Sequence, residues 1–298
     1  MTGPVRRFLR DRWEKNGPGL VCLATGGFNR FLLPARPRPL DPQRDGVPVF
    51  CYHDVDAAAF SADLDALAAG GYRTLTAEAF RLHARGETIA PAGSVLLTVD
   101  DGAASLHDVI WPALRERGMH AIAFVCPRLH RDTDADPAGF CTWSELRRMQ
   151  ASGEIDCQPH TPDHRDLVRW PEPVPLTGVD REAAARRQAA GDGRDPDRTA
   201  SLRAARDELA DGLGIAVERL THLALPRHHG SAAVRRDAAA AGFDVIYGGF
   251  EPGRVLQRPS DDPLRVPRLL PGALHRLPGP SRRTLADAAR RWLRPRTP

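Results

Sequence analysis

Residues 94–102 read SVLLTVDDG, an apolar run that ends in two aspartates and a glycine. A run of valine and leucine without polar alternation is typical of a strand that is buried on both faces of a parallel sheet. Gly102 allows the chain to turn directly after the aspartates. We therefore expect a central strand over 94–99, with Asp100 and Asp101 at its carboxyl end.

On both sides of this run, short apolar segments alternate with segments of helical periodicity. Thr142 and Glu145 form a capping-box signature for one helix, and Thr76 is an expected N-cap of another. Repeated strand–helix units predict an α/β fold with a parallel sheet, and about seven units favour closure into a barrel. The expected strands cover 47–53, 72–75, 94–99, 120–126, 154–157, 222–225 and 243–247, and the expected helices cover 60–69, 77–85, a segment ending at 117, 143–151, 200–212 and 231–241.

Two later regions are less regular in sequence. Residues 170–198 hold clusters of proline, glycine and aspartate and are expected to be the least structured part. Residues 255–270 are expected to contain a last extended element, followed by an arginine-rich helix over 283–293.

The aspartate pair stands where an α/β fold places its functional groups, at the carboxyl end of a strand. Adjacent strand residues point to opposite faces, but the turn at Gly102 lets both carboxylates approach one cleft. Asp-Asp-Gly alone is also a common turn, so the pair indicates a functional site only together with a second motif.

That second motif is His-Thr-Pro-Asp-His at 160–164, just after the expected strand 154–157. Thr161 suits an N-cap and Pro162 suits the first helical position, so we expect a helix to begin here. His160 and His164, four residues apart, would then converge on one point. Alone, a His-x-x-x-His pair can also be a surface or capping pair.

Two neutral imidazoles and one carboxylate form the three-ligand set of a catalytic zinc-type site, with a position open for water. One of the two aspartates would bind the metal, and the other would accept a proton from the metal-bound water. Attack on a carbonyl would give an oxyanion that the metal and backbone N–H groups stabilise. The combined motifs predict metal-dependent hydrolysis of an amide or ester.

The two motifs, in this order, resemble those of the polysaccharide deacetylases, the NodB-homology domain of carbohydrate esterase family 4. TVDDG at 98–102 is similar to the TFDDG first motif of the family, and HTPDH at 160–164 matches its H-[S/T]-x-x-H second motif. The resemblance extends over residues 47–270. It implies a distorted (β/α)7-type barrel, in a single domain, that removes an N-acetyl group from an N-acetylated polysaccharide, oligosaccharide or glycosylated metabolite. By position, it makes Asp100 the general base, and it makes Asp101, His160 and His164 the ligands of a divalent ion, with Zn²⁺ expected.

The third motif departs from the family pattern. The usual R-x-P-Y or Y-P-Y-G is similar to LPRHHG at 225–230, where Pro226 fits but the aromatic residue is missing. That aromatic residue shapes the sugar site and contributes a backbone N–H, which Arg227 or His228 would have to supply here. This departure leaves open an alternative, a catalytically weak carbohydrate-binding member of the same fold.

The general acid of the family, the histidine of a late L-x-H motif, has no convincing match. Leu274-His275 comes too soon after VPRLL (266–270) to serve. His53, at the end of the first expected strand, is a candidate acid, and a structural histidine bonded to the backbone is the equal alternative. Arg268 could orient Asp100 at the substrate site, although the arginine-rich composition favours an exposed arginine.

Composition excludes several other classes of function. The 298 residues include 42 basic and 38 acidic residues, interspersed, for a net charge of +4. Because no nucleic-acid-binding signature accompanies this charge, we expect no nucleic-acid partner. Five cysteines without a C-x-x-C pair argue against a disulfide framework or zinc ribbon and favour a reducing compartment. His228-His229 are expected to contact substrate or solvent, and the charged segment 180–206 to be a solvated helix and loop, with contact to a phosphate-bearing substrate as its alternative.

The expected organisation is an N-terminal extension with a Pro/Arg-rich linker (1–46), a catalytic domain (47–272) and a C-terminal basic helix (273–298). The first residues make a poor signal peptide, and no run approaches the roughly 18 apolar residues of a spanning helix. We therefore expect a cytoplasmic protein, with envelope association as the alternative. The basic helix would pack on the barrel or make peripheral membrane contact. The oligomeric state stays open.

Overall fold

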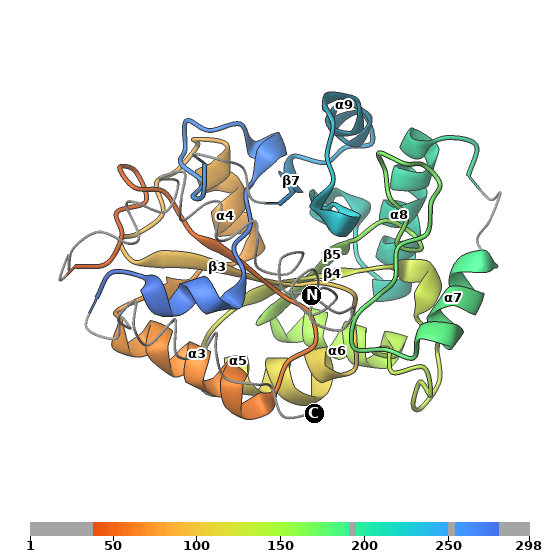
Figure 1. Cartoon of the computed structure of the whole chain (residues 1–298), viewed down its shortest axis with the longest axis horizontal. Coiled ribbons are helices and arrows are strands. Elements are labelled where there is room, and N and C mark those ends of the chain that lie inside the picture. The colour runs from red at the N-terminus through yellow and green to blue at the C-terminus, as the bar shows by residue number, and fades with distance from the viewer. Residues whose placement is uncertain (1–37, 191–194, 250–253, 280–298) are drawn as a thin grey trace, which may run out of the picture.

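The structure is a computed structural model that describes residues 38–190, 195–249 and 254–279. Parallel strands run through the middle of the molecule, and helices lie on both sides of them (Figure 1). The strands are β1 (Val49–Tyr52), β2 (Arg73–Thr74), β3 (Ser94–Val99), β4 (Ala121–Val125), β5 (Ile155–Pro159), β6 (His222–Ala224) and β7 (Val245–Tyr247). The helices are α3 (Ala57–Ala69), α4 (Ala77–Ala84), α5 (Trp111–Glu116), α6 (Trp143–Ser152), α7 (Arg181–Ala189), α8 (Arg198–Leu213) and α9 (Ala232–Ala240), and a π-helical turn, η1 (Leu106–Ile110), precedes α5.

The largest sheet has the order β1-β3-β4-β5, all parallel, and β2 pairs with the start of β3. The register sets Val49 opposite Leu96 and Thr98 opposite Ile122. Every residue of β3 is buried, as the uninterrupted apolar run predicts. The sequence prediction of a central parallel strand is therefore confirmed.

A second parallel pair, β6 and β7, continues the curve of the sheet toward β1. Tyr247 of β7 bridges Val266, and Leu269 bridges Phe50 of β1, both in parallel. The strands thus return to their starting point through isolated bridges, which makes the barrel a distorted one. The predicted extended element over 255–270 is reduced to such bridges and a short 3-10 turn, η5 (Pro263–Arg265).

Between β5 and β6, side chains take the place of a strand ladder within the described residues. The backbone N–H of His222 donates to Oε1 of Gln158 (3.1 Å), and Nδ1 of His160 donates to the carbonyl oxygen of Ala224 (2.9 Å). We call this junction the β5–β6 seam. With Nδ1 bonded at the seam, the other ring nitrogen of His160, Nε2, faces Asp100 and Asp101.

Alternate strand residues face the outside and the inside of the barrel, as the two-residue repeat of a strand requires. Outward residues such as Phe50 and Val99 pack under α3, α5, α6 and α8 in the largest apolar cluster. Inward residues such as Leu96 and Phe124 form a second cluster with α4. Asp100 continues the inward series of β3, so its carboxylate lies at the barrel mouth.

Helix starts follow the predicted caps. Thr142 accepts a hydrogen bond from the N–H of Glu145, whose carboxylate accepts one from the N–H of Thr142, which completes the capping box of α6. Thr76 caps α4 by accepting from the N–H of Ala79. Both predictions are confirmed.

One expectation about the later chain is wrong. Residues 170–198, expected to be the least structured, contain α7 over 181–189. Asp180 caps it by accepting from Ala183, and alanine, arginine and glutamine within it are good helix formers. The separate expectation of a solvated helix and loop over 180–206 agrees with α7 and with the start of α8 at Arg198.

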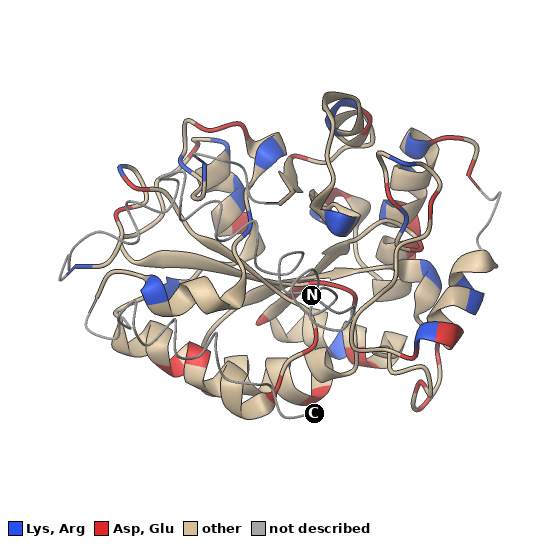
Figure 2. Cartoon of the chain, viewed as in Figure 1, with Lys and Arg blue, Asp and Glu red and all other residues tan. Residues whose placement is uncertain are grey.

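Other expectations stay predictions. The C-terminal helix over 283–293 lies outside the described residues, and the proposed domain limits and cytoplasmic location are untouched by the fold. Across the described ranges, no helix combines the length and apolar character that a membrane crossing needs. Acidic and basic residues are interspersed along the described chain, as expected (Figure 2).

Candidate metal-dependent active site

The chain reverses direction directly after β3, and this turn brings two carboxylates together. Asp101 has a φ of 74° and Gly102 a φ of 69°, both in the left-handed region. The side chains of Asp100 and Asp101 therefore approach one place instead of pointing to opposite faces. Oδ2 of Asp100 and Oδ1 of Asp101 lie 3.8 Å and 3.7 Å from the same atom, Nε2 of His160.

The His-Thr-Pro-Asp-His segment forms a turn, and the expected helix start is wrong. Thr161 and His164 have φ values of 64° and 59°, which a right-handed helix cannot contain. His160 extends β5, with its N–H donating to the carbonyl oxygen of Val125 (2.8 Å). The two histidines still converge, because the left-handed residues curl the loop back toward β3.

Three ligand-type side chains come together at this point: Asp101, His160 and His164, all buried. Oδ1 of Asp101 lies 3.7 Å from Nε2 of His160 and 3.5 Å from Nε2 of His164. These separations are close to the ~3.3 Å edge of a tetrahedron with metal–ligand bonds of ~2.0–2.1 Å. The cluster could hold a metal ion.

The other atom of each ligand group is already bonded, which aims the ligand atoms inward. Nδ1 of His160 donates to Ala224, and Nδ1 of His164 donates to the carbonyl oxygen of Val174 (2.9 Å). Oδ2 of Asp101 accepts from the N–H of Thr177 (2.7 Å). Its Oδ1 is buried without a hydrogen-bond partner, a costly arrangement that a bound cation would relieve. These residues therefore fit a metal.

The protonation states suit the same role. Burial lowers the pKa of His160 to about 3 and that of His164 to about 4, so both imidazoles are neutral ligands at pH 7. Burial raises the pKa of Asp101 to about 6, and the negative charge of Asp100 adds to this rise. A cation in the cluster would favour the ionised carboxylate again.

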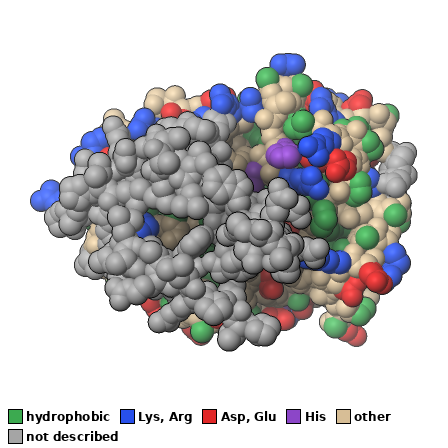
Figure 3. Space-filling model, viewed as in Figure 1, with side chains coloured by type: hydrophobic (Ala, Val, Ile, Leu, Met, Phe, Trp, Pro, Cys, Tyr) green, Lys and Arg blue, Asp and Glu red, His purple; other side chains and the backbone are tan. Residues whose placement is uncertain are grey.

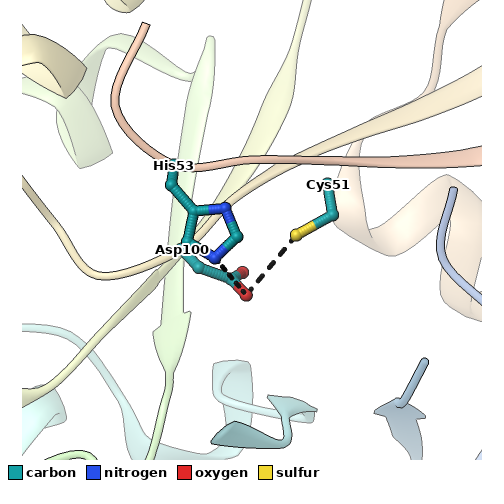
Figure 4. Close-up of side chains that lie close together, drawn as sticks. All are labelled: Cys51, His53 and Asp100. Atoms are coloured by element: carbon teal, nitrogen blue, oxygen red, sulfur yellow. Dashed lines mark hydrogen bonds and ion pairs between the residues drawn. The ribbon is translucent and has the colours of Figure 1, made fainter. Parts of the chain in front are cut away.

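Besides His160, three side chains of different chemistry surround Asp100. Arg268 donates from Nη1 to Oδ1 (2.6 Å), and Sγ of Cys51 donates to Oδ2 (3.6 Å). Nε2 of His53 lies 4.0 Å from Oδ2, and Figure 4 shows His53 and Cys51 approaching the carboxylate from different directions. Burial by itself raises the pKa of Asp100, but the charges of Arg268, His160 and His53, with the hydrogen bond from Arg268, together outweigh burial and hold the pKa well below its ordinary value.

The sequence favoured an exposed Arg268, and that expectation is wrong. Its side chain is 1% exposed and lies inside the barrel, with its guanidinium 5.8 Å from the ring centre of Phe124. A buried guanidinium requires a partner of opposite charge, and Asp100 is that partner. The alternative that the sequence left open, an arginine that orients Asp100, agrees with this contact.

Leu274-His275 is not near the site, in agreement with the sequence argument against it as the late motif. Nε2 of His275 bonds Oδ1 of Asp63 on α3 (2.6 Å), and Tyr52 donates to the other oxygen of that carboxylate (3.0 Å). This network ties the end of the described chain to the outer side of the barrel.

The third motif lies beside Arg268. Pro226–His228 form a 3-10 turn, η4, in which Arg227 and His228 have positive φ values. The N–H of His228 donates to the carbonyl oxygen of Leu225 (2.9 Å), so Arg227 remains the better candidate for an oxyanion donor. The imidazole of His228 accepts a hydrogen bond at Nδ1 from Arg268 (2.9 Å).

Sequence reasoning missed the groups that orient the ligands. Val174, Thr177 and Ala224 act through backbone atoms, which leave no side-chain signal in a sequence. Cys51 belongs to no motif in the sequence, and its contact with Asp100 follows from the alternation of side chains along β1, which turns Cys51 inward between Val49 and His53.

A family model described as polysaccharide deacetylase matches residues 88–246, more than half of the chain and including both ligand motifs. The chain belongs to the polysaccharide deacetylase family. Among curated proteins, no relative matches it.

Solved structures of deacetylases share the fold. IcaB from Ammonifex degensii is 26% identical, with a TM-score of 0.56, over 76% of this chain and 92% of that one. The deacetylase PplD of Streptococcus pyogenes, in complex with acetate, is 18% identical, with a TM-score of 0.59, over 81% of this chain and all of that one. A de-N-acetylase from Aggregatibacter actinomycetemcomitans is 16% identical, with a TM-score of 0.54, over 83% and 99%. The distorted barrel predicted from the sequence is thereby confirmed.

Proposed function

We propose that this polysaccharide deacetylase family member is a zinc-dependent hydrolase that removes the acetyl group from the nitrogen of an N-acetylated sugar. The observation that carries the proposal is the metal-fitting cluster of Asp101, His160 and His164 with a second carboxylate, Asp100, beside it. Family membership supports a carbohydrate amide as the substrate class.

Each side chain would then have a separate task. A divalent ion on the three ligands would lower the pKa of a neighbouring water and polarise the amide carbonyl group. Asp100 is ionised beside this cluster, so it is the base that takes a proton from the attacking water. Because Oδ1 is bonded to Arg268, the proton goes to Oδ2.

The leaving nitrogen needs a proton as well. His53 is our candidate donor, because its ring is 35% exposed at the barrel mouth and Nε2 lies 4.0 Å from the proton-accepting oxygen of Asp100. The N–H of Arg227 is our candidate for stabilising the developing oxyanion, with Pro226 and His228 shaping the turn that presents it.

The second candidate function is sugar binding without turnover. The observation in its favour is the η4 turn, which carries Arg227 and His228 where the family usually has an aromatic residue. An altered oxyanion donor could slow the chemistry while leaving the sugar cleft intact.

An acetate-release assay with the full chain separates the two. We expect the zinc-loaded protein to release acetate from N-acetylglucosamine oligomers, to stop with a chelator and to recover with zinc. Asp100→Asn should lower the rate by ~10²–10⁴-fold, as loss of a general base does. Asp108→Asn, an exposed aspartate on η1, is the matched control and should keep the rate. Sugar binding with no acetate release would favour the second candidate, and neither binding nor release would overturn both.

A further inference from the structure

A pocket of about 470 Å³ lies beside the η4 turn, where α9 begins and η5 ends. Within the described part of the chain, its wall includes no aspartate or glutamate but three arginines and two histidines, Arg169, Arg235, Arg265, His228 and His229. Figure 3 shows histidine and basic side chains gathered on this face, below the position of α9 in Figure 1. The pocket wall is therefore cationic.

Carboxylates near the pocket do not cancel this charge. Asp166 is fully buried behind His229, whose Nδ1 lies 3.1 Å from Oδ2 of the carboxylate. Glu172 lies 3.8 Å from Arg169 and 3.9 Å from Arg227, so one carboxylate is shared by two guanidinium groups. Arg235 donates to a backbone carbonyl oxygen, that of Gly230 (3.4 Å). Among the described residues, the pocket wall therefore holds three arginines and no carboxylate.

The pocket adjoins the candidate catalytic site through one residue. His228 lines the pocket and accepts a hydrogen bond from Arg268, and the same guanidinium bonds Asp100. Burial lowers the pKa of His228 to about 3, so a neutral ring links Arg268 to the wall of the pocket. A sugar with its acetamide at the metal cluster would extend past His228 toward the arginines.

We propose that this arginine-lined pocket binds an anionic group of the substrate, a phosphate or a carboxylate, so that the enzyme acts on a negatively charged N-acetylated glycan. This inference rests on the proposed function. Arginine suits both groups, because its planar fork donates two parallel hydrogen bonds to a pair of anionic oxygens. Neutral chitin-like oligomers offer this pocket hydroxyl and acetamide groups but no anionic oxygen atoms.

Binding measurements on the full-length, metal-free chain test the pocket without turnover. The probes are N-acetylglucosamine 1-phosphate for the phosphate, a disaccharide of N-acetylglucosamine and glucuronate for the carboxylate, and neutral di-N-acetylchitobiose as reference. Calorimetry gives Kd for each. We expect at least one charged probe to bind tenfold or more tightly than the neutral one, with an advantage that shrinks as salt is raised. The charged probe that shows the advantage identifies the group.

Two variants place the effect in the pocket. Arg235→Gln combined with Arg265→Gln should raise the Kd of the charged probe tenfold or more, and Arg265→Gln alone, at an exposed position, should raise it in part. Arg236→Gln is the matched control, because Arg236 follows Arg235 on α9 but does not line the pocket. It should change Kd less than twofold. Unfolding curves for each variant confirm that the fold is kept.

Equal binding of charged and neutral probes, or an equal loss in Arg236→Gln, would overturn the inference. Acetate release from charged and neutral sugars without preference would overturn the anionic-substrate inference and leave the proposed function standing. Tight, arginine-dependent binding of a charged probe with no acetate release from any sugar would overturn the proposed function alone.

Discussion

Arg268 and Asp100 form a buried ion pair inside the barrel, with Nη1 of the arginine 2.6 Å from Oδ1 of the aspartate and both side chains at most 2% exposed. The pair joins a residue that follows β7 to the end of β3, across the barrel interior. It holds the pKa of Asp100 well below its ordinary value, so the carboxylate is ionised wherever the protein is folded near neutral pH.

The first prediction concerns this pair. Arg268→Met should destabilise the protein by ~3–5 kcal/mol, because it leaves a buried carboxylate without its counter-charge. Arg268→Met combined with Asp100→Asn should recover a large part of that loss, since no buried charge then remains. Urea unfolding of the wild type, both single variants and the double variant measures the coupling. Additive effects of the two substitutions would contradict it.

The second prediction concerns the ligands. Elemental analysis of the zinc-loaded chain should find the ion lost in Asp101→Asn and in His164→Gln, because each removes one of three ligand atoms. Asp108→Asn removes a carboxylate from a separate, partly exposed group of ligand-type side chains, His107, Asp108 and Glu145, and should keep the ion. Zinc should also raise the unfolding midpoint of the wild type and not that of Asp101→Asn. If only Asp108→Asn lost the ion, the metal would be bound by His107, Asp108 and Glu145, and the prediction would be wrong.

The third prediction concerns the turn after β3. Gly102 has a φ of 69°, and a Cβ there would lie 2.7 Å from Cε1 and 2.9 Å from Nε2 of the buried His130 ring. Gly118 has a φ of 58° with nothing within 4 Å of such a Cβ. Gly118→Ala should cost only the ~1–2 kcal/mol of left-handed strain, whereas Gly102→Ala should cost more and weaken zinc binding by displacing Asp101. Equal costs for the two substitutions, with zinc affinity unchanged, would exclude this role for the turn.

The fourth prediction concerns acid stability of the metal-free chain. Burial lowers the pKa of His130 to about 4 and that of His222 to about 3, below the ordinary value of 6.5. The unfolded chain therefore binds these protons first as the pH falls through 6.5. Below pH 6.5, the free energy of unfolding falls by ~1.4 kcal/mol per histidine for each pH unit. The loss continues until the folded-state pKa is reached, and stability above pH 6.5 is unaffected. Urea unfolding at pH 7 and pH 5 should show a smaller loss for His222→Gln than for the wild type; an identical loss would mean that His222 takes no part.

The sequence predicted the elements of this fold for local reasons. The apolar run over 94–99, the Thr142–Glu145 box and the Asp-Asp-Gly turn each carry their structure in adjacent residues, and each was confirmed. The rule that functional groups follow strand ends then placed both ligand motifs at one mouth.

What the sequence could not supply was conformation and long-range pairing. Nothing in the types of Thr161 and His164 indicates a left-handed backbone, so a helix start was the natural but wrong expectation. Arg268 lies 168 positions from Asp100, and only the closed barrel shows that it is buried and paired. The cationic pocket likewise draws its arginines from three separate segments.

The β5–β6 seam gives His160 a structural role that does not depend on a metal ion. His160 fastens the seam with one ring nitrogen and offers the other to the metal cluster. A related chain without the proposed activity could still use this hydrogen bond to hold β5 beside β6. Conservation of His160 among related chains is therefore weak evidence for enzymatic activity, because selection for the fold alone could also retain it.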